Sequence, residues 1–282
     1  MIDLKNVSKI YSNTTALSNF TIKIDKPGIY CLLGRNGAGK TTLLKTIAGH
    51  IETTEGEVSV AGKPVKPLAM PDSVHFVETA ASHFNLSLEQ LLKAAAAINP
   101  AFDSDFALEI AKKFNLNLRK RYRKLSFGMK AMVNTLIAMS SGKDILILDE
   151  PVLGFDPVMR KTFYDLLHES VASKPKIVIV STHIIDEIAK VAEQLIIINH
   201  GKLLLYSDIN EIDEKAYSIT GPAEYVAAAT EGLNVLADTK AGGFLSRYIY
   251  DKRIQESDKY SINTLSLQDF FIGLVGNEKG GF

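Results

Sequence analysis

Hydrophobic and polar residues follow two different rhythms along this chain. Over residues 1–33 they alternate or form a short apolar run, GIYCLL, which predicts β-strands. Between residues 86 and 140, apolar residues recur every three or four positions, which predicts helices. Uninterrupted apolar runs then return in DILILDE, KIVIVST and QLIIIN, with helices expected near 160–172 and 185–192. Such runs are typical of a parallel sheet covered on both faces.

The order of these segments predicts an α/β fold with a mainly parallel sheet and a helical insertion at about residues 86–140. After Gly201 the rhythm changes. Short segments there predict a strand, a helix and a hairpin, and SLQDFFIGLVG predicts a final helix. We therefore expect a first domain over residues 1–210 and a small C-terminal α+β domain over residues 211–282.

Composition narrows the class of protein. The 282 residues are 46% hydrophobic, and 32 basic side chains balance 32 acidic ones, so no net charge draws the surface to nucleic acid or anionic lipid. The single cysteine, Cys31, lies in an apolar run and is expected to be a buried hydrophobe. No apolar stretch approaches the roughly 18 residues that span a bilayer, and the first residues lack the apolar core of a signal peptide. Work at a membrane would therefore need another subunit.

A phosphate-binding loop is the clearest motif. Residues 34–41, GRNGAGKT, match the pattern GxxxxGK[ST]. They lie between a buried strand and a helix, a context that favours a phosphate loop over an ordinary glycine-rich turn. Backbone N–H groups and the helix N-terminus would bind phosphate, Lys40 would reach the β- and γ-phosphates, and Thr41 would hold Mg²⁺. The predicted nucleotide-binding residues of this segment are Gly34, Asn36, Gly37, Ala38, Gly39, Lys40, Thr41 and Thr42.

Two further strand ends carry polar residues. Asp149 and Glu150 follow the buried run ILIL, where adjacent carboxylates need a cationic partner. An Asp in this place holds Mg²⁺ in P-loop nucleoside triphosphatases, and the Glu is suited to activate a water molecule. His183 follows IVIVST, at the edge where ligands bind in open α/β sheets, and we expect it to contact the γ-phosphate.

Together these residues resemble the ATP-binding subunit of an ABC transporter of the bacterial exporter type. GRNGAGKTT resembles the Walker A motif, ILILDEP the Walker B motif with its catalytic Glu150, LGFDP the D-loop with Asp156, STH the H-loop, and KLSFGMK the family signature. Tyr11 occupies the place of the aromatic residue that stacks on adenine. The resemblance covers residues 1 to about 210, and the ending TLSLQDFFIGLVG is also similar to the close of many bacterial exporter-type subunits.

The resemblance implies a P-loop ATPase core with an N-terminal antiparallel β subdomain. It implies that two subunits face head to tail around two ATP–Mg²⁺, so that Ser126 and Gly128 of one subunit cap the γ-phosphate held by the other. ATP binding and hydrolysis would drive a separate transmembrane permease between two access states. The subunit would then lie at the cytoplasmic face of the cell membrane.

This sequence departs from the family pattern at several positions. Phe127 and Met129 replace a Gly and a Gln of the signature, and Phe155 replaces the usual Leu of the D-loop. By spacing, Glu78 stands where the Q-loop has Gln, and a carboxylate there could bind Mg²⁺ directly. The surface from Thr79 to Leu88 is the expected contact for a coupling helix of the membrane subunit.

Other functions stay open. A soluble ABC-type ATPase could act on DNA or the ribosome or serve as a sensor or regulator, although no coiled coil or second cassette is visible. A P-loop phosphotransferase is a further alternative, but such an enzyme should shield the γ-phosphate from water. The basic run at residues 119–124 is best explained as a solvated face, so no nucleic-acid partner is expected. The cargo, its direction and the choice between homodimer and heterodimer stay undetermined.

Overall fold

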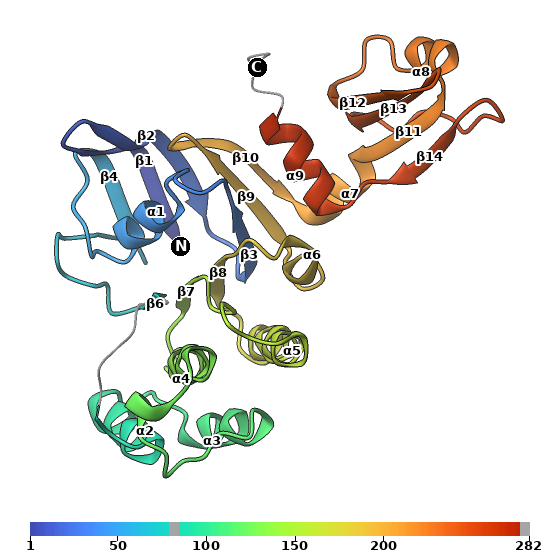
Figure 1. The fold of residues 1–282 in the computed structure, drawn as a ribbon. Coiled ribbons are helices and arrows are strands. Elements are labelled where there is room, and N and C mark those ends of the chain that lie inside the picture. Colours follow the sequence, from blue (N-terminus) through green and yellow to red (C-terminus); the bar gives the residue numbers. More distant parts are fainter. Residues whose placement is uncertain (79–84, 277–282) are drawn as a thin grey trace. The chain divides into compact units, whose positions relative to one another are not determined.

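The computed structural model describes residues 1–78 and 85–276 (Figure 1). The chain divides into two compact units, Met1–Tyr206 and Ser207–Phe282. The expected fold class is confirmed, because the first unit combines a mainly parallel sheet with an antiparallel β subdomain and a helical segment, and the second is a small α+β unit. In the described part of the chain, no helix has the length and apolar character needed to cross a bilayer.

Two sheets form the framework of the first unit. The antiparallel sheet has the order β2-β1-β4-β5 and consists of β1 (Ile2–Tyr11), β2 (Thr14–Ile24), β4 (Glu55–Val60) and β5 (Lys63–Pro64). The larger sheet has the order β10-β9-β3-β8-β7-β6 and consists of β3 (Gly28–Leu33), β6 (Val74–Glu78), β7 (Ile145–Asp149), β8 (Ile177–Ser181), β9 (Gln194–Asn199) and β10 (Lys202–Asp208). Strands β6, β7, β8, β3 and β9 run parallel, so their carboxyl ends lie at one edge.

The central strands explain the uninterrupted apolar runs. Every residue of β3, β7 and β8 is buried. One continuous apolar core links both sheets with helix α1 (Lys40–Ile47), through side chains such as Phe20, Leu44 and Ile147. Cys31 is fully buried, and burial raises the pKa of its thiol, as expected for a small core hydrophobe.

Helices cover this sheet and form the insertion. They are α2 (Leu88–Ile98), α3 (Ser104–Lys113), the 3-10 turn η1 (Tyr122–Lys124), α4 (Phe127–Met139), α5 (Pro157–Ser173) and α6 (Ile185–Ile188). Side-chain caps begin four of the helices, at Ser87, Asp103, Ser126 and Asp156. The helix predicted over 185–192 is wrong in length. It ends at Ile188 because the hydrogen bonds then change to a three-residue spacing, with Lys190 N donating to Glu187 O at 3.4 Å and Val191 N to Ile188 O at 3.0 Å. Glu193 N then joins the sheet by donating to Ile29 O at 2.9 Å.

The second unit has a core of its own. Its antiparallel sheet has the order β12-β13-β11-β14 and consists of β11 (Ala216–Pro222), β12 (Val235–Ala241), β13 (Phe244–Tyr250) and β14 (Ser261–Thr264), with helices α7 (Ile209–Lys215), α8 (Ala223–Ala229) and α9 (Leu267–Gly276). Tyr217, Ile219 and Val226 are central to the core. Strand β14 was not predicted, because SINT offers one apolar residue, Ile262, which pairs with Ile219.

Candidate active site

The predicted site residues gather at one edge of the parallel sheet. Strand β3 leads into the phosphate loop, β7 ends at Asp149, and β8 ends two residues before His183. These three strands are neighbours, with Leu32 and Asp149 both in register with Ser181. Because parallel strands place their carboxyl ends together, three distant sequence segments meet here.

The phosphate loop depends on glycine at one position above all. Gly39 has φ +107° and precedes α1, where its carbonyl accepts from Leu43 N at 2.9 Å. A Cβ atom at Gly39 would collide with the carbonyl oxygen of Ala16. Gly37 also has a positive φ, +81°, but a Cβ there would meet open space. The loop therefore needs Gly39 for both its backbone angle and its close approach to Ala16.

Lys40 lies at the mouth of this loop. Its Nζ donates to the carbonyl oxygens of Gly34 at 2.7 Å and Arg35 at 3.3 Å. Burial lowers the pKa of Lys40, and the nearby carboxylates of Glu150 and Asp149 oppose that shift. A partly desolvated ammonium group is a strong partner for an anion, because little hydration is left to displace.

Asp149 receives hydroxyl groups on both carboxylate oxygens. Thr41 Oγ1 donates to Oδ2 at 2.7 Å, and Ser181 Oγ donates to Oδ1. Asp149 as a whole is only 6% exposed, so these contacts compensate part of the desolvation of its carboxylate. The hydroxyl of Thr41 and the carboxylate of Asp149 are hard oxygen donors of the kind that Mg²⁺ prefers.

Glu150 and His183 form a pair beside this carboxylate. His183 Nδ1 lies 2.8 Å from Glu150 Oε2. Glu150 has φ +50°, an unfavourable backbone angle for a side chain of this size, and its N–H donates to Ser181 O at 3.0 Å. Such strain costs about 1–3 kcal/mol and occurs often at functional sites. Here it turns the chain sharply at the strand end, where Glu150 meets the side chain that follows β8.

Glu78 lies next to Asp149 in the sheet. It is the last residue of β6 and pairs in register with Asp149. Its Oε1 forms an ion pair with Lys45 Nζ at 2.6 Å, and Lys45 belongs to α1. The carboxylate therefore stands at the same edge as the Thr41–Asp149 contact but is compensated by its own cation. Residues 79–84, part of the expected coupling-helix surface, lie outside the described residues.

A cleft of about 360 Å³ opens over the phosphate loop. Its lining is Thr14, Thr15, Ala16, Asn36, Gly37, Ala38, Gly39, Lys40, Thr41, Thr42, Asp149 and Glu150. Sequence reasoning missed Thr14, Thr15 and Ala16, although they follow the short turn after Tyr11. Tyr11 itself is outside this lining. It is 44% exposed, and Lys9 Nζ lies 5.1 Å from its ring centroid.

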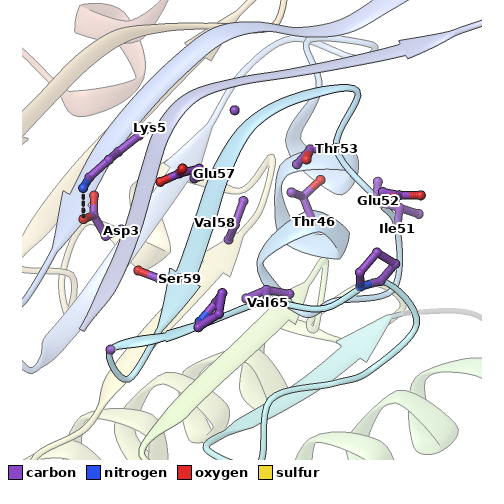
Figure 2. A pocket seen from close by; sticks show the side chains of 14 residues that line it. Asp3, Lys5, Thr46, Ile51, Glu52, Thr53, Glu57, Val58, Ser59 and Val65 are labelled. Carbon is purple, nitrogen blue, oxygen red and sulfur yellow. Dashed lines mark ion pairs between the residues drawn. The ribbon is translucent and has the colours of Figure 1, made fainter.

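A larger hollow lies elsewhere in the first unit. It measures about 470 Å³ and is bordered by β1, β4 and the end of α1, with Thr46, Val58 and the Asp3–Lys5 ion pair in its wall (Figure 2). None of the predicted site residues lines it. Size alone therefore does not identify the functional site, whereas the convergence of three strand ends does.

The signature and D-loop residues contact each other. Ser126 Oγ caps α4 by accepting from Met129 N at 3.3 Å, and Asp156 caps α5 by accepting from Met159 N at 2.8 Å. A Cβ at Gly128 would collide with the carbonyl oxygen of Gly154, so α4 begins against the D-loop. Phe127 lies beside Gly154 and is 48% exposed. Ser126, Gly128 and Asp156 are outside the lining described for the cleft of their own chain.

A phosphate loop between a buried strand and a helix, with Asp149 and Glu150 on the neighbouring strand, defines a P-loop nucleoside triphosphatase. Comparisons with known proteins define the class further. The family model described as ABC transporter matches residues 17–153. SrtF of Streptococcus pyogenes, a lantibiotic transport ATP-binding protein, is 30% identical over 207 residues, which cover 73% of this chain and 90% of SrtF.

Two further comparisons extend the likeness. BcrA of Enterococcus faecalis, a bacitracin transport ATP-binding protein, is 26% identical over 306 aligned positions, covering 98% of this chain and 96% of BcrA. The structure of a dimeric bacterial ABC transporter cassette matches with a TM-score of 0.65 and 24% identity, over 74% of this chain and 99% of that one. The chain belongs to the ABC transporter family as an ATP-binding subunit, and is an ATPase of that family.

The two loop glycines provide a matched test of the cleft. We expect Gly39→Ala to weaken ATP binding about tenfold or more. The added methyl group would displace the loop, and a displacement that costs about 1.4 kcal/mol of binding free energy already lowers the affinity tenfold. Gly37→Ala introduces only an unfavourable φ, so its loss should be smaller. Titration of both variants with a fluorescent ATP analogue would measure the difference. Equal affinities for the two variants would contradict the importance of the Ala16 contact.

Proposed function

We propose that two copies of this ATPase, or one copy and a related subunit, assemble head to tail around two ATP–Mg²⁺ and drive a membrane permease. The observation that carries the proposal is the Glu150–His183 pair at 2.8 Å, beside the cleft that contains the phosphate loop. A carboxylate that lines the cleft and is oriented by an imidazole can act as the base for a water molecule attacking the γ-phosphate. His183 then contacts the γ-phosphate itself.

The remaining residues of the cleft bind the nucleotide. The backbone N–H groups from Gly34 to Gly39 surround the phosphates, and Lys40 exchanges its carbonyl partners for phosphate oxygens. Thr42 lies in the first turn of α1, whose N-terminus adds partial positive charge. Tyr11 binds adenine. Its ring is exposed, so one face is available to stack on a base. The ring does not line the cleft that surrounds the phosphate loop.

Thr41 and Asp149 would hold Mg²⁺. Their oxygens already face each other at 2.7 Å, and they fit a hard cation in chemistry. When bound, the ion neutralises charge that develops on the β- and γ-phosphates. Glu78 is a third oxygen donor at this edge, supported by its register with Asp149. Lys45 competes with the cation for that carboxylate.

The head-to-tail arrangement is supported by the position of the signature residues among the described residues of the chain. Ser126, Gly128 and Asp156 are outside the lining of their own cleft, yet they lie together where α4 meets the D-loop. A helix N-terminus with a serine hydroxyl suits the γ-phosphate of another subunit. The similar bacterial cassette is described as dimeric, which agrees with this assembly.

Export is the direction that we propose, because the ending TLSLQDFFIGLVG is similar to the close of many bacterial exporter-type subunits. SrtF and BcrA are named for transport of a lantibiotic and of bacitracin. We infer that this subunit works at the cytoplasmic face of the membrane, bound to a separate transmembrane permease. The alignment with BcrA covers 98% of this chain, so it includes most of the second unit as well as the first.

Glu150→Gln tests the catalytic assignment. Because the amide cannot take a proton from water, we expect steady-state ATP hydrolysis to fall by about a hundredfold or more, while ATP–Mg²⁺ binding and ATP-dependent dimerisation persist. Phosphate release and light scattering would measure the two properties. Glu109→Gln, on the exposed face of α3, is the control and should hydrolyse ATP normally. Near-normal turnover in Glu150→Gln would refute the role of this carboxylate.

Substitutions of Glu78 and of Lys45 should change the Mg²⁺ requirement of ATP hydrolysis in opposite directions. Replacing Glu78 with Gln removes a charged oxygen, so the Mg²⁺ concentration for half-maximal ATP hydrolysis should rise about threefold or more. Lys45→Ala frees that carboxylate from its ion pair and should lower the same concentration. Activity measured across a Mg²⁺ titration at saturating ATP gives both values. An unchanged half-maximal concentration in Glu78→Gln would remove this residue from the metal site.

The partner can be identified directly. Tagged Glu150→Gln protein, purified with ATP–Mg²⁺ from gently solubilised native membranes, should bring down a multi-span membrane protein that mass spectrometry identifies. The same experiment shows whether the second ATPase is a copy or a relative. Recovery of soluble partners alone, with the subunit absent from the membrane fraction, would favour a regulatory ATPase and refute the role in transport.

A further inference from the structure

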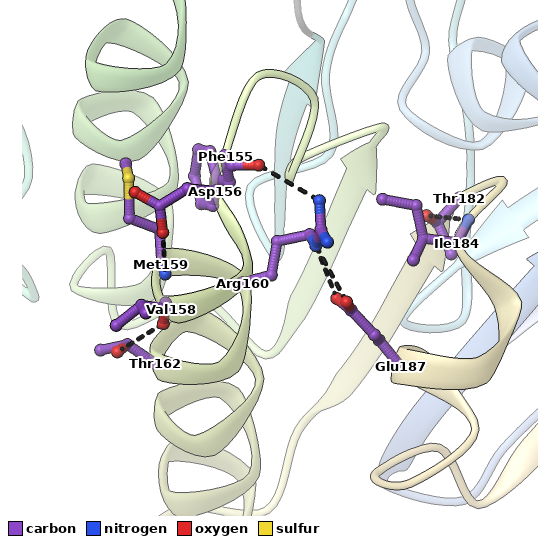
Figure 3. Close-up of polar contacts among 9 residues, drawn as sticks. All are labelled: Phe155, Asp156, Val158, Met159, Arg160, Thr162, Thr182, Ile184 and Glu187. Atoms are coloured by element: carbon purple, nitrogen blue, oxygen red, sulfur yellow. Dashed lines mark hydrogen bonds and ion pairs between the residues drawn. The ribbon is translucent and has the colours of Figure 1, made fainter.

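A partly buried ion pair connects two segments of the site, the D-loop and the segment that follows β8 (Figure 3). Arg160 lies in the first turn of α5, and its Nε donates to both carboxylate oxygens of Glu187, at 3.0 and 2.9 Å. Its Nη1 donates to the carbonyl oxygen of Phe155 at 3.2 Å. The two charged side chains are 22% and 28% exposed, so solvent screens this pair less than an ordinary surface pair.

The acceptors of Arg160 belong to different parts of the site. Phe155 directly precedes Asp156 in the loop between β7 and α5. Glu187 belongs to α6, which begins two residues after His183 and spans a single turn. So short a helix is not stable alone, and its position depends on tertiary contacts. Thr182 Oγ1 fixes its start by accepting from Ile184 N at 3.0 Å, and Arg160 holds it near its end.

Only arginine suits this position. Its planar guanidinium directs N–H groups along several fixed directions, so one side chain can bind a carboxylate and a carbonyl at the same time. A lysine ammonium is a single point of charge and would leave one of the two acceptors without its partner. The Arg160 backbone is itself joined to the D-loop, because Arg160 N donates to Asp156 O at 3.0 Å in the first turn of α5.

We infer that Arg160 is a positioning residue that makes the D-loop and the segment carrying His183 move together. This inference rests on the proposed function, in which Asp156 belongs to the subunit interface and His183 contacts the γ-phosphate of its own cleft. Through Glu187 and Phe155, Arg160 transmits a displacement of α6 to the interface. The state of one nucleotide thereby affects how its subunit meets the other.

Kinetics of single and double variants test this coupling. In both Arg160→Ala and Glu187→Ala, kcat for ATP hydrolysis should fall about tenfold, as expected when catalytic groups are misplaced, while KM changes less than about twofold because the phosphate loop is intact. The double variant should lose no more than either single one. Arg160→Lys should recover part of kcat. Lys161→Ala removes the adjacent exposed ion pair with Asp165 and should leave kcat unchanged.

Hydrogen exchange provides a readout that does not depend on ATP hydrolysis. In nucleotide-free protein, Glu187→Ala should accelerate amide exchange in peptides covering residues 152–156, whereas Lys161→Ala should not. Normal kcat in Arg160→Ala, additive losses in the double variant, or unchanged exchange in residues 152–156 would each overturn the inference. A wild-type protein that hydrolyses no ATP would instead refute the proposed function, and the exchange data would still decide whether Glu187 and the D-loop are linked.

Discussion

The carboxylate of Asp149 holds three elements of the active site in one place. Its oxygens accept from Thr41 on α1 and from Ser181 on β8, while its backbone completes β7. A buried carboxylate without such partners would cost several kcal/mol, so the helix after the phosphate loop and the neighbouring strand are both tied to its position. The distance between the loop, the acidic strand end and His183 follows from this contact and from the parallel register of the strands.

Parts of this arrangement can be predicted from sequence because they depend on local rules. The apolar runs identify β3, β7, β8 and β9, since strands buried on both faces leave no polar alternation. Gly39 and Lys40 are recognisable because a phosphate loop requires them in that order. Glu150 and His183 are recognisable because each follows the carboxyl end of such a strand. The 2.8 Å between Glu150 Oε2 and His183 Nδ1 depends on the register of the strands, which the sequence pattern does not reveal.

Other features arise only in three dimensions. Thr14, Thr15 and Ala16 line the cleft because the start of β2 lies beside the phosphate loop, where Ala16 O approaches Gly39, and their composition carries no signal of that position. The ion pair of Glu78 with Lys45 joins residues of separate elements and cannot be anticipated from either motif. Strand β14 forms because β11 offers it a partner, and not because SINT favours an extended conformation by itself.

The backbone of Glu150 has a consequence for the evolution of this chain. A left-handed conformation is far easier for glycine, or for asparagine, than for glutamate. Substitutions that relieve the strain would stabilise the folded subunit while removing the carboxylate that faces the cleft. Selection for folding alone therefore favours loss of this side chain. A related subunit with glycine or asparagine at this position would remain well folded while its own site no longer hydrolyses ATP.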